Sequence, residues 1–216
     1  MDLKNYTKAS EVYRDIVFME NKNTGYQIAV KHAELEKGIN EIKAYQSMSH
    51  SSLIDFSIDK DGVLMMLHRH AGRPLTDWLA SPKMCAKLAE NMDSLLASAL
   101  LALERLHTSG IWHGSINPNK IIIDDDYSVQ FVGFGYSTNL LECTGSGQSD
   151  KYTAPEIVLG GCVDGRAADL YALGKSLMEI LKVAECFDLN AINQIAEMSS
   201  VIPQKRQLFL DAFSGK

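Results

Sequence analysis

Long apolar runs, closely spaced cysteines and basic blocks are all missing from this sequence. Its four cysteines lie far apart with no C-x-x-C spacing, which favours free thiols in a reducing compartment over disulfides or a zinc site. The segment Met1–Lys8 lacks the apolar core of a signal peptide. The most apolar helical stretch, Leu95–Leu103, is too short to span a bilayer. We therefore expect a cytoplasmic protein with no membrane partner.

Charge of one sign does not accumulate either. The net charge of −6 is spread over 216 residues without a basic run, which argues against nucleic acid as a partner. Apolar residues make up 46% of the chain and charged residues 22%, values typical of a folded globular protein. A chain of this length can bury the core of one ordinary domain or of two small lobes.

The periodicity of apolar residues changes once along the chain, at Gly72-Arg73-Pro74. Before this break, the pattern predicts strands and one helix: Ile16–Glu20, Tyr26–His32, Glu34–Met48 as the helix, Leu53–Ile58 and Val63–His68. After it, the pattern predicts helices at Thr76–Ala80, Ala86–Thr108, Ala167–Leu181, Asn190–Met198 and Lys205–Phe213, with short strands at Lys120–Asp124 and Ser128–Val132. This order predicts an α+β fold with two lobes and a hinge near His68–Gly72.

A series of motifs follows the same order along the chain. The motifs are Ile28-Ala29-Val30-Lys31, Asn40-Glu41-Ile42, Leu106-His107 with Gly110-Ile111 and His113, Ala154-Pro155-Glu156, Ala168-Asp169 with Gly174, and Pro203 with Arg206. Through them, residues 10–213 resemble the eukaryotic-type protein kinase family. The resemblance implies a single bilobal kinase-like domain over residues 1–216. A small antiparallel sheet lobe with one helix would occupy about residues 1–70, and a larger, mainly helical lobe about residues 71–216.

The resemblance also implies a candidate nucleotide site. Lys31 corresponds to the phosphate-pairing lysine and Glu41, or alternatively Glu36, to its helix partner; the pair could equally serve as an ion pair that holds the helix. The remaining candidate positions are Val12, Ala29 and Ile122 around the adenine, Leu67 as gatekeeper, and His68, Arg69 and His70 in the hinge. The adenine positions are equally good core residues. The hinge histidines could instead form a solvated surface or a pH-sensitive contact.

The catalytic loop keeps its layout and loses its reacting groups. The positions of the base, the γ-phosphate-steadying residue and the two metal ligands hold Ser115, Asn117, Lys120 and Gly133. A serine accepts no proton usefully near neutral pH, and neither lysine nor glycine offers magnesium a side-chain oxygen. We therefore expect no metal site. No glycine precedes Gly25, so a glycine-rich phosphate loop is absent as well.

Residues with architectural roles in the family are kept, namely His113, Phe134, Glu156, Asp169 and Arg206. Glu156 and Arg206 are expected to form a bidentate ion pair, and Asp169 to cap the loop backbone. Gly114 replaces the arginine that would bind a phosphorylated segment, so phosphorylation would lack its usual docking partner. The candidate acceptors are Ser137, Thr138, Thr144, Ser146 and Ser149. The run Asp124–Asp126 is interpreted as an acidic turn, not a metal site.

Selective loss of these chemical groups predicts a pseudokinase that acts in signalling as a protein-interaction or allosteric regulatory module. Its partner would be a protein, such as a kinase or a kinase substrate. Two alternatives stay open. One is a divergent Ser/Thr kinase in which Lys31 and Lys120 replace metal charge, and the other is a switch that binds ATP without magnesium. In its compact size the chain is similar to bacterial effectors and to viral or phage kinase homologues. A bacterial effector or viral protein would act in the host cytoplasm.

Overall fold

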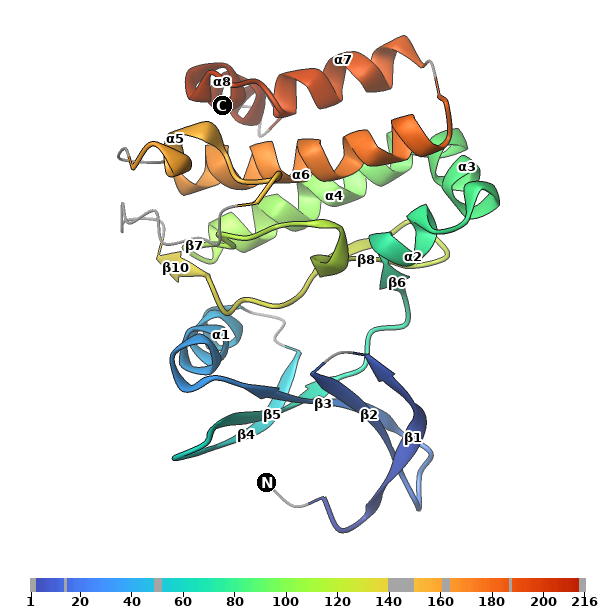
Figure 1. The fold of residues 1–216 in the computed structure, drawn as a ribbon, viewed down its shortest axis with the longest axis vertical. Coiled ribbons are helices and arrows are strands. Elements are labelled where there is room, and N and C mark those ends of the chain that lie inside the picture. The colour runs from blue at the N-terminus through green and yellow to red at the C-terminus, as the bar shows by residue number, and fades with distance from the viewer. Residues whose placement is uncertain are drawn as a thin grey trace. The chain divides into compact units, whose positions relative to one another are not determined.

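The structure is a computed structural model that describes residues 3–13, 15–48, 52–139, 150–160, 164–186 and 188–213. The chain folds as two compact units, Met1–Ala71 and Gly72–Lys216 (Figure 1). The first is a sheet with one helix, and the second is mainly helical. The predicted α+β fold class is therefore confirmed.

The first unit is a five-stranded antiparallel sheet with the strand order β1-β2-β3-β5-β4. Its elements are β1 (Tyr6–Tyr13), β2 (Ile16–Asn21), β3 (Gln27–Ala33), α1 (Leu35–Ser47), β4 (Leu53–Asp59) and β5 (Gly62–His68). The predicted strands Ile16–Glu20 and Tyr26–His32 correspond to β2 and β3, which form a hairpin with Ile16 opposite Lys31 and Glu20 opposite Gln27. Asn21 at its turn accepts backbone hydrogen bonds through its side chain, as turn asparagines often do.

The two faces of this sheet bury different residues, as the period-2 alternation of a strand requires. Ile28, Val30 and Met66 form a buried cluster on one face. Val63 is also fully buried, and helix α1 packs so closely on it that a Cβ atom at Gly38 would lie 2.4 Å from the Val63 Cβ. Glycine at position 38 therefore allows the helix to approach the sheet.

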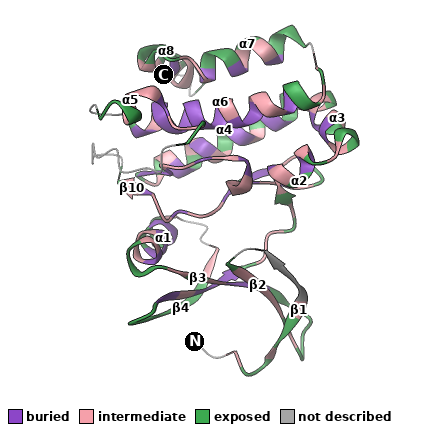
Figure 2. Ribbon diagram, in the orientation of Figure 1, coloured by how far each residue is buried: buried purple, intermediate pink, exposed green. Residues whose placement is uncertain are grey.

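The second unit is built around the helix α6, Gly165–Val183, which is buried on nearly every side (Figure 2). It packs against α3 (Pro82–Glu90), α4 (Met92–Thr108), α7 (Leu189–Met198) and α8 (Pro203–Phe213). The shorter elements are β6 (Arg73–Pro74), α2 (Leu75–Leu79), β7 (Ile111–Trp112), a 3₁₀ turn at Pro118–Lys120, β8 (Ile121–Ile123), β9 (Val129–Phe131), β10 (Thr138–Asn139) and α5 (Pro155–Val158). None of the helices in the described ranges is long and apolar enough to cross a membrane.

One expected helix is wrong. The segment Ala86–Thr108 is two helices, α3 and α4, separated at Asn91. The Asn91 side chain donates to Lys87 O at 2.9 Å and to Tyr127 Oη at 3.0 Å, so a residue 36 positions further along fixes the break. Strand β1, the two-residue strands and α5 were not expected either, since β1 is largely polar and the others are too short to show a period.

Candidate functional site

Lys31 and Glu41 form an ion pair inside the first unit. The Lys31 ammonium on β3 donates to Glu41 Oε2 on α1 at 2.6 Å, and the Glu41 side chain is only 1% exposed. The alternative partner, Glu36, is exposed. Burial, with help from the Glu41 carboxylate, raises the pKa of Tyr45 well above its usual value. Lys31 is thus held at α1 by a contact that needs no ligand.

The other small-lobe candidates are core or hinge residues of the same unit. Ala29 and Leu67 are buried and lie opposite each other on β3 and β5, and the Val12 side chain lies outside the described residues. The Arg69 guanidinium lies 4.3 Å above the Phe18 ring. The polar contacts of the segment His68–His70 include Tyr26 Oη with His68 Nδ1, Arg69 Nη1 to Gln27 Oε1 at 2.9 Å, and Ser52 Oγ with His70 Nε2 at 3.3 Å.

In the second unit, Asp169 fixes the loop that follows β7. From the first half of α6, its carboxylate accepts from the backbone N–H groups of His113 at 2.7 Å and Gly114 at 3.0 Å. His107 Nε2 lies 3.0 Å from the same carboxylate. Asp169 is 2% exposed, so these bonds satisfy a buried charge. The capping role expected from the sequence is therefore present.

His113 is fully buried and keeps a single orientation. Its Nε2 lies 3.1 Å from Val132 O, and because a carbonyl only accepts, Nε2 carries the proton. Its ring packs on Phe134 with centroids 4.9 Å apart. The pKa of His113 is lowered to about 4, mainly by burial and also by the Lys120 charge, while Asp169 opposes the shift. A neutral His113 thus joins the loop to the start of the next segment.

Glu156 and Arg206 form the expected ion pair, but it is not bidentate. Arg206 Nη2 donates to Glu156 Oε1. The other nitrogens donate to backbone carbonyls, Nε to Ala167 O at 2.8 Å and Nη1 to Ser200 O. Arg206 is fully buried, so its donors are divided among three acceptors rather than given to one carboxylate. The guanidinium thereby joins α5, α6 and α8.

Lys120 lies at the end of the loop that follows β7, in the 3₁₀ turn Pro118–Lys120. Its ammonium donates to Ser115 Oγ and lies 5.4 Å from the centre of the Tyr136 ring. A Cβ atom at Gly133 would lie 3.4 to 3.6 Å from the Lys120 methylene carbons. The Lys120 side chain therefore passes beside the position that a side chain at residue 133 would take, and its ammonium reaches Ser115. Sequence comparison singled out these three positions, and the structure brings them into contact.

A magnesium ion does not fit this arrangement. Magnesium needs oxygen ligands, whereas Gly133 supplies no side chain and Lys120 supplies a positive charge at the place of a ligand. Asn117 is turned to the loop itself: its Oδ1 accepts from Asn119 N at 3.1 Å, and its Nδ2 donates to Ser115 O at 3.3 Å. Among the residues that the structure describes, no group of three or more histidines, cysteines or carboxylates could hold a metal ion.

Gly114 has a conformation that excludes the side chain it replaces. Its φ is +72°, and a Cβ atom there would lie 2.5 Å from Tyr136 O. Of the candidate phosphorylation sites, Ser137 is buried and donates to Phe134 O at 2.6 Å, and Thr138 Oγ1 accepts from Trp112 Nε1. The candidates Thr144, Ser146 and Ser149 lie outside the described residues.

The acidic run Asp124–Asp126 forms a turn between β8 and β9. Tyr127 N donates to Asp124 O at 3.0 Å, and Ser128 N donates to Asp126 Oδ1 at 2.9 Å. The Ser128 hydroxyl, together with this backbone N–H, lowers the pKa of Asp126. Ile122, the remaining adenine candidate, lies on β8 opposite Gln130.

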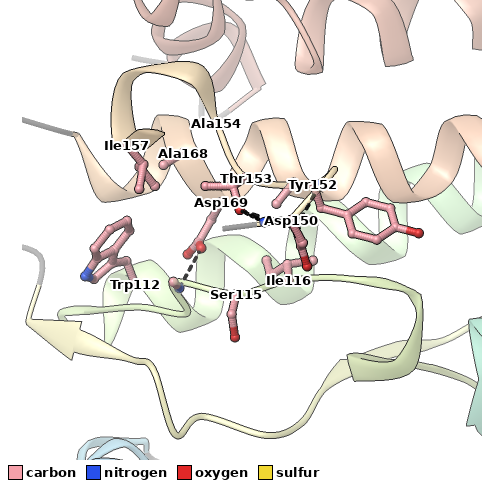
Figure 3. Close-up of a pocket in the computed structure, with 12 residues that line it drawn as sticks. Trp112, Ser115, Ile116, Asp150, Tyr152, Thr153, Ala154, Ile157, Ala168 and Asp169 are labelled. Atoms are coloured by element: carbon pink, nitrogen blue, oxygen red, sulfur yellow. Dashed lines mark hydrogen bonds between the residues drawn. The ribbon is translucent and has the colours of Figure 1, made fainter. Parts of the chain in front are cut away.

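A small hollow, with a cavity volume of about 20 Å³, lies beside Ser115 (Figure 3). Its walls are the loop Trp112–Ile116, the segment Asp150–Ile157 and one side of α6.

Glu179 on α6 holds two residues of the segment Asp150–Ile157. Tyr152 Oη and Lys151 Nζ both donate to Glu179 Oε1, at 2.7 and 2.5 Å. Sequence analysis missed Glu179, because no motif marks it and its partners lie more than 25 positions away.

Comparison with known proteins gives consistent results. The protein kinase domain family matches residues 10–211. Relatives include maternal embryonic leucine zipper kinase of Danio rerio, 25% identical over 83% of this chain and 29% of the relative. Serine/threonine-protein kinase PAK 5 of Rattus norvegicus is 25% identical over 83% of this chain and 26% of the relative. Serine/threonine-protein kinase RUNKEL of Arabidopsis thaliana is 26% identical over 70% and 12%. The chain thus spans less than a third of the length of these relatives.

Proposed function

Because the chain belongs to the protein kinase domain family, we propose that it is a pseudokinase, a kinase fold that binds a protein partner and transfers no phosphate. Kinases catalyse phosphoryl transfer by positioning ATP and neutralising its charge with metal ions. The proposal concerns how this chain departs from that scheme. Its partner is a protein of a signalling process, such as a kinase or a kinase substrate, in the cytoplasm.

The observation that carries the proposal is the position of Lys120. Its ammonium donates to Ser115 Oγ, and its methylenes border the position that a Cβ atom at Gly133 would take. The residue at the place of the catalytic base is therefore bound to a cation, and the place of a metal ligand has no side-chain oxygen and lies beside the Lys120 hydrocarbon. Both features oppose proton abstraction and magnesium binding. The scaffold contacts of Asp169 and Arg206 stay intact beside them.

Phosphate transfer measured with radiolabelled ATP tests the proposal. The wild-type chain is incubated with generic protein substrates in Mg²⁺ or Mn²⁺, and we expect no incorporation above a no-enzyme blank. The Lys31→Ala variant removes the lysine of the ion pair, and Lys43→Ala, an exposed lysine on α1, is its matched control. Incorporation that Lys31→Ala abolishes and Lys43→Ala leaves unchanged would show an active kinase and refute the proposal.

A second candidate function is an ATP-binding switch that needs no magnesium. It is favoured by the retained Lys31–Glu41 pair and by the Lys120 ammonium, a fixed positive charge in the loop. The midpoint of thermal unfolding, measured with ATP in EDTA, tests this function. The variant Lys120→Met keeps a side chain of similar length at position 120 and removes its charge. Stabilisation in EDTA that Lys120→Met removes supports the switch, and no stabilisation with or without Mg²⁺ rejects it.

The divergent-kinase alternative uses the same residue differently. If Lys120 replaced metal charge during transfer, Lys120→Ala would eliminate any measured turnover. Turnover that survives Lys120→Ala would reject this alternative.

A further inference from the structure

Strand β4 is an edge strand with exposed apolar side chains. It stands last in the sheet order, so β5 pairs with it on one side only. Its residues from Ile54 to Asp59 are exposed (Figure 2), with exposed fractions of 40% at Ile54, 36% at Phe56 and 51% at Ile58. Apolar side chains on an edge strand favour pairing with another strand, which is why edges are usually blunted.

The register explains why these side chains are not covered. Phe56 lies opposite Met65 and Ile58 opposite Val63, and directly opposed residues of an antiparallel pair project from the same face. Met65 and Val63 are fully buried because α1 packs mainly on β5. Their neighbours on β4 share that face without being enclosed by the helix.

The exposed apolar side chains of β4 form one surface. Phe56 and Ile58 are two residues apart on the strand, so they project from the same face, and both are exposed. Phe56 and Ile58 are here called the β4 strip.

The charge around the β4 strip is acidic. Asp55, Asp59 and Asp61 are exposed, and Lys60 is the one basic residue between Leu53 and Gly62. Antiparallel pairing of two copies of β4 about Ser57 would place Asp55 opposite Asp59 of the second copy. Like charges directly opposite each other are destabilising, so a second copy is disfavoured and a basic segment is favoured.

We propose that the β4 edge binds an extended segment of a partner protein by strand addition. The segment has apolar residues at alternate positions, which cover Phe56 and Ile58, and lysine or arginine at its ends, which face the aspartates. In this mode, main-chain hydrogen bonds give affinity, and alternate side chains give specificity. The inference rests on the interaction role in the proposed function and names the surface that would perform it.

Fluorescence anisotropy with a labelled peptide tests the proposal. The peptide has valines alternating with threonines between pairs of lysines, and its control has glutamates in place of the lysines. The test variant is Phe56→Thr with Ile58→Thr, which removes apolar surface and keeps strand propensity. Val201→Thr, at a residue 67% exposed in the second unit, is the matched control. Circular dichroism and thermal unfolding check that each variant is folded.

We expect the lysine peptide to bind the wild type and Val201→Thr equally, and the double variant about tenfold more weakly. Asp61→Lys, in the turn outside β4, is expected to weaken binding several-fold and to reduce its salt dependence. Equal binding by the double variant, equal binding of the glutamate peptide, or no binding by the wild type would each overturn the proposal. So would a wild-type dimer that the double variant abolishes, since the occupant would then be a second copy. Phosphate transfer is measured separately, so failure here leaves the absence of catalysis untouched.

Discussion

Replacing Asp169 with asparagine tests how far one buried carboxylate stabilises the loop that follows β7. Asp169 accepts from His113 N and Gly114 N and lies 3.0 Å from His107 Nε2. Asparagine has nearly the same shape, but it replaces one acceptor oxygen with an NH₂ donor. Whichever way the amide turns, at least one buried donor meets another donor.

The magnitude follows from the bonds lost. Leaving a buried donor unsatisfied costs about 1–3 kcal/mol, and bonds to a charged group lie at the upper end of that range. We therefore expect Asp169→Asn to lower the free energy of unfolding by about 2–3 kcal/mol. A domain of this size would then lose roughly 4–12 °C in Tm. An energy loss of about 2–3 kcal/mol is a large share of the roughly 5–15 kcal/mol that stabilises a typical domain.

Urea unfolding followed by circular dichroism measures the loss, with Asp164→Asn as the control. Asp164 lies on the same helix as its N-cap, and its Oδ1 accepts from Arg166 N at 2.9 Å. Asparagine is as good an N-cap as aspartate, so this variant should stay within about 1 kcal/mol of the wild type. If the free energy of unfolding of Asp169→Asn also lies within about 1 kcal/mol of the wild-type value, the loop does not depend on the Asp169 carboxylate.

Three further outcomes are expected. Gly114→Ala should destabilise the chain by more than about 1 kcal/mol in the same urea assay, because alanine disfavours the left-handed conformation and its Cβ meets Tyr136 O; wild-type stability would contradict this. His113 has a folded-state pKa of about 4, below its usual value, so the unfolded chain takes up the proton first. Stability should therefore be complete above about pH 6.5 and fall by roughly 3 kcal/mol as the pH drops to about 4; His113→Gln should show a shallower decline, and an identical decline would exclude His113 as the cause. Gly133→Asp alone should bind no Mg²⁺ in isothermal calorimetry, because the new carboxylate would pair with Lys120; measurable binding would contradict that reasoning.

Local patterns predicted those parts of the fold whose determinants lie close together in sequence. The β2–β3 hairpin depends on the alternation of apolar and polar residues in its own strands and on its turn. The ends of the predicted strands differ from the observed ends by no more than one residue. Helix α6 is likewise predicted over Ala167–Leu181 and extends two residues further at each end. The break at Asn91 could not be predicted in this way, because its side chain bonds to Tyr127 in a distant turn.

The candidate site shows the same division between local and distant determinants. Alignment with kinase motifs identified the residue types at positions 115, 120 and 133, since each has a fixed place in the motif series. It could not predict that the Lys120 chain lies along Gly133 or that the Arg206 guanidinium also bonds to Ala167 O and Ser200 O. These contacts depend on side-chain directions that only the folded unit defines.

The three substitutions in the loop are physically coupled, which strengthens the case against weak residual catalysis. A glycine at position 133 gives the Lys120 methylenes room beside the backbone, and a serine at position 115 gives the ammonium an acceptor without a second charge. Returning a carboxylate to either position would attract the Lys120 ammonium into an ion pair and still leave a cation where magnesium would sit. A metal site would need oxygen ligands at both position 120 and position 133, whereas the capping bonds of Asp169 to His113 N and Gly114 N involve neither residue. The backbone contacts of this loop are therefore separable from the chemistry of its side chains, which is consistent with the proposed binding role.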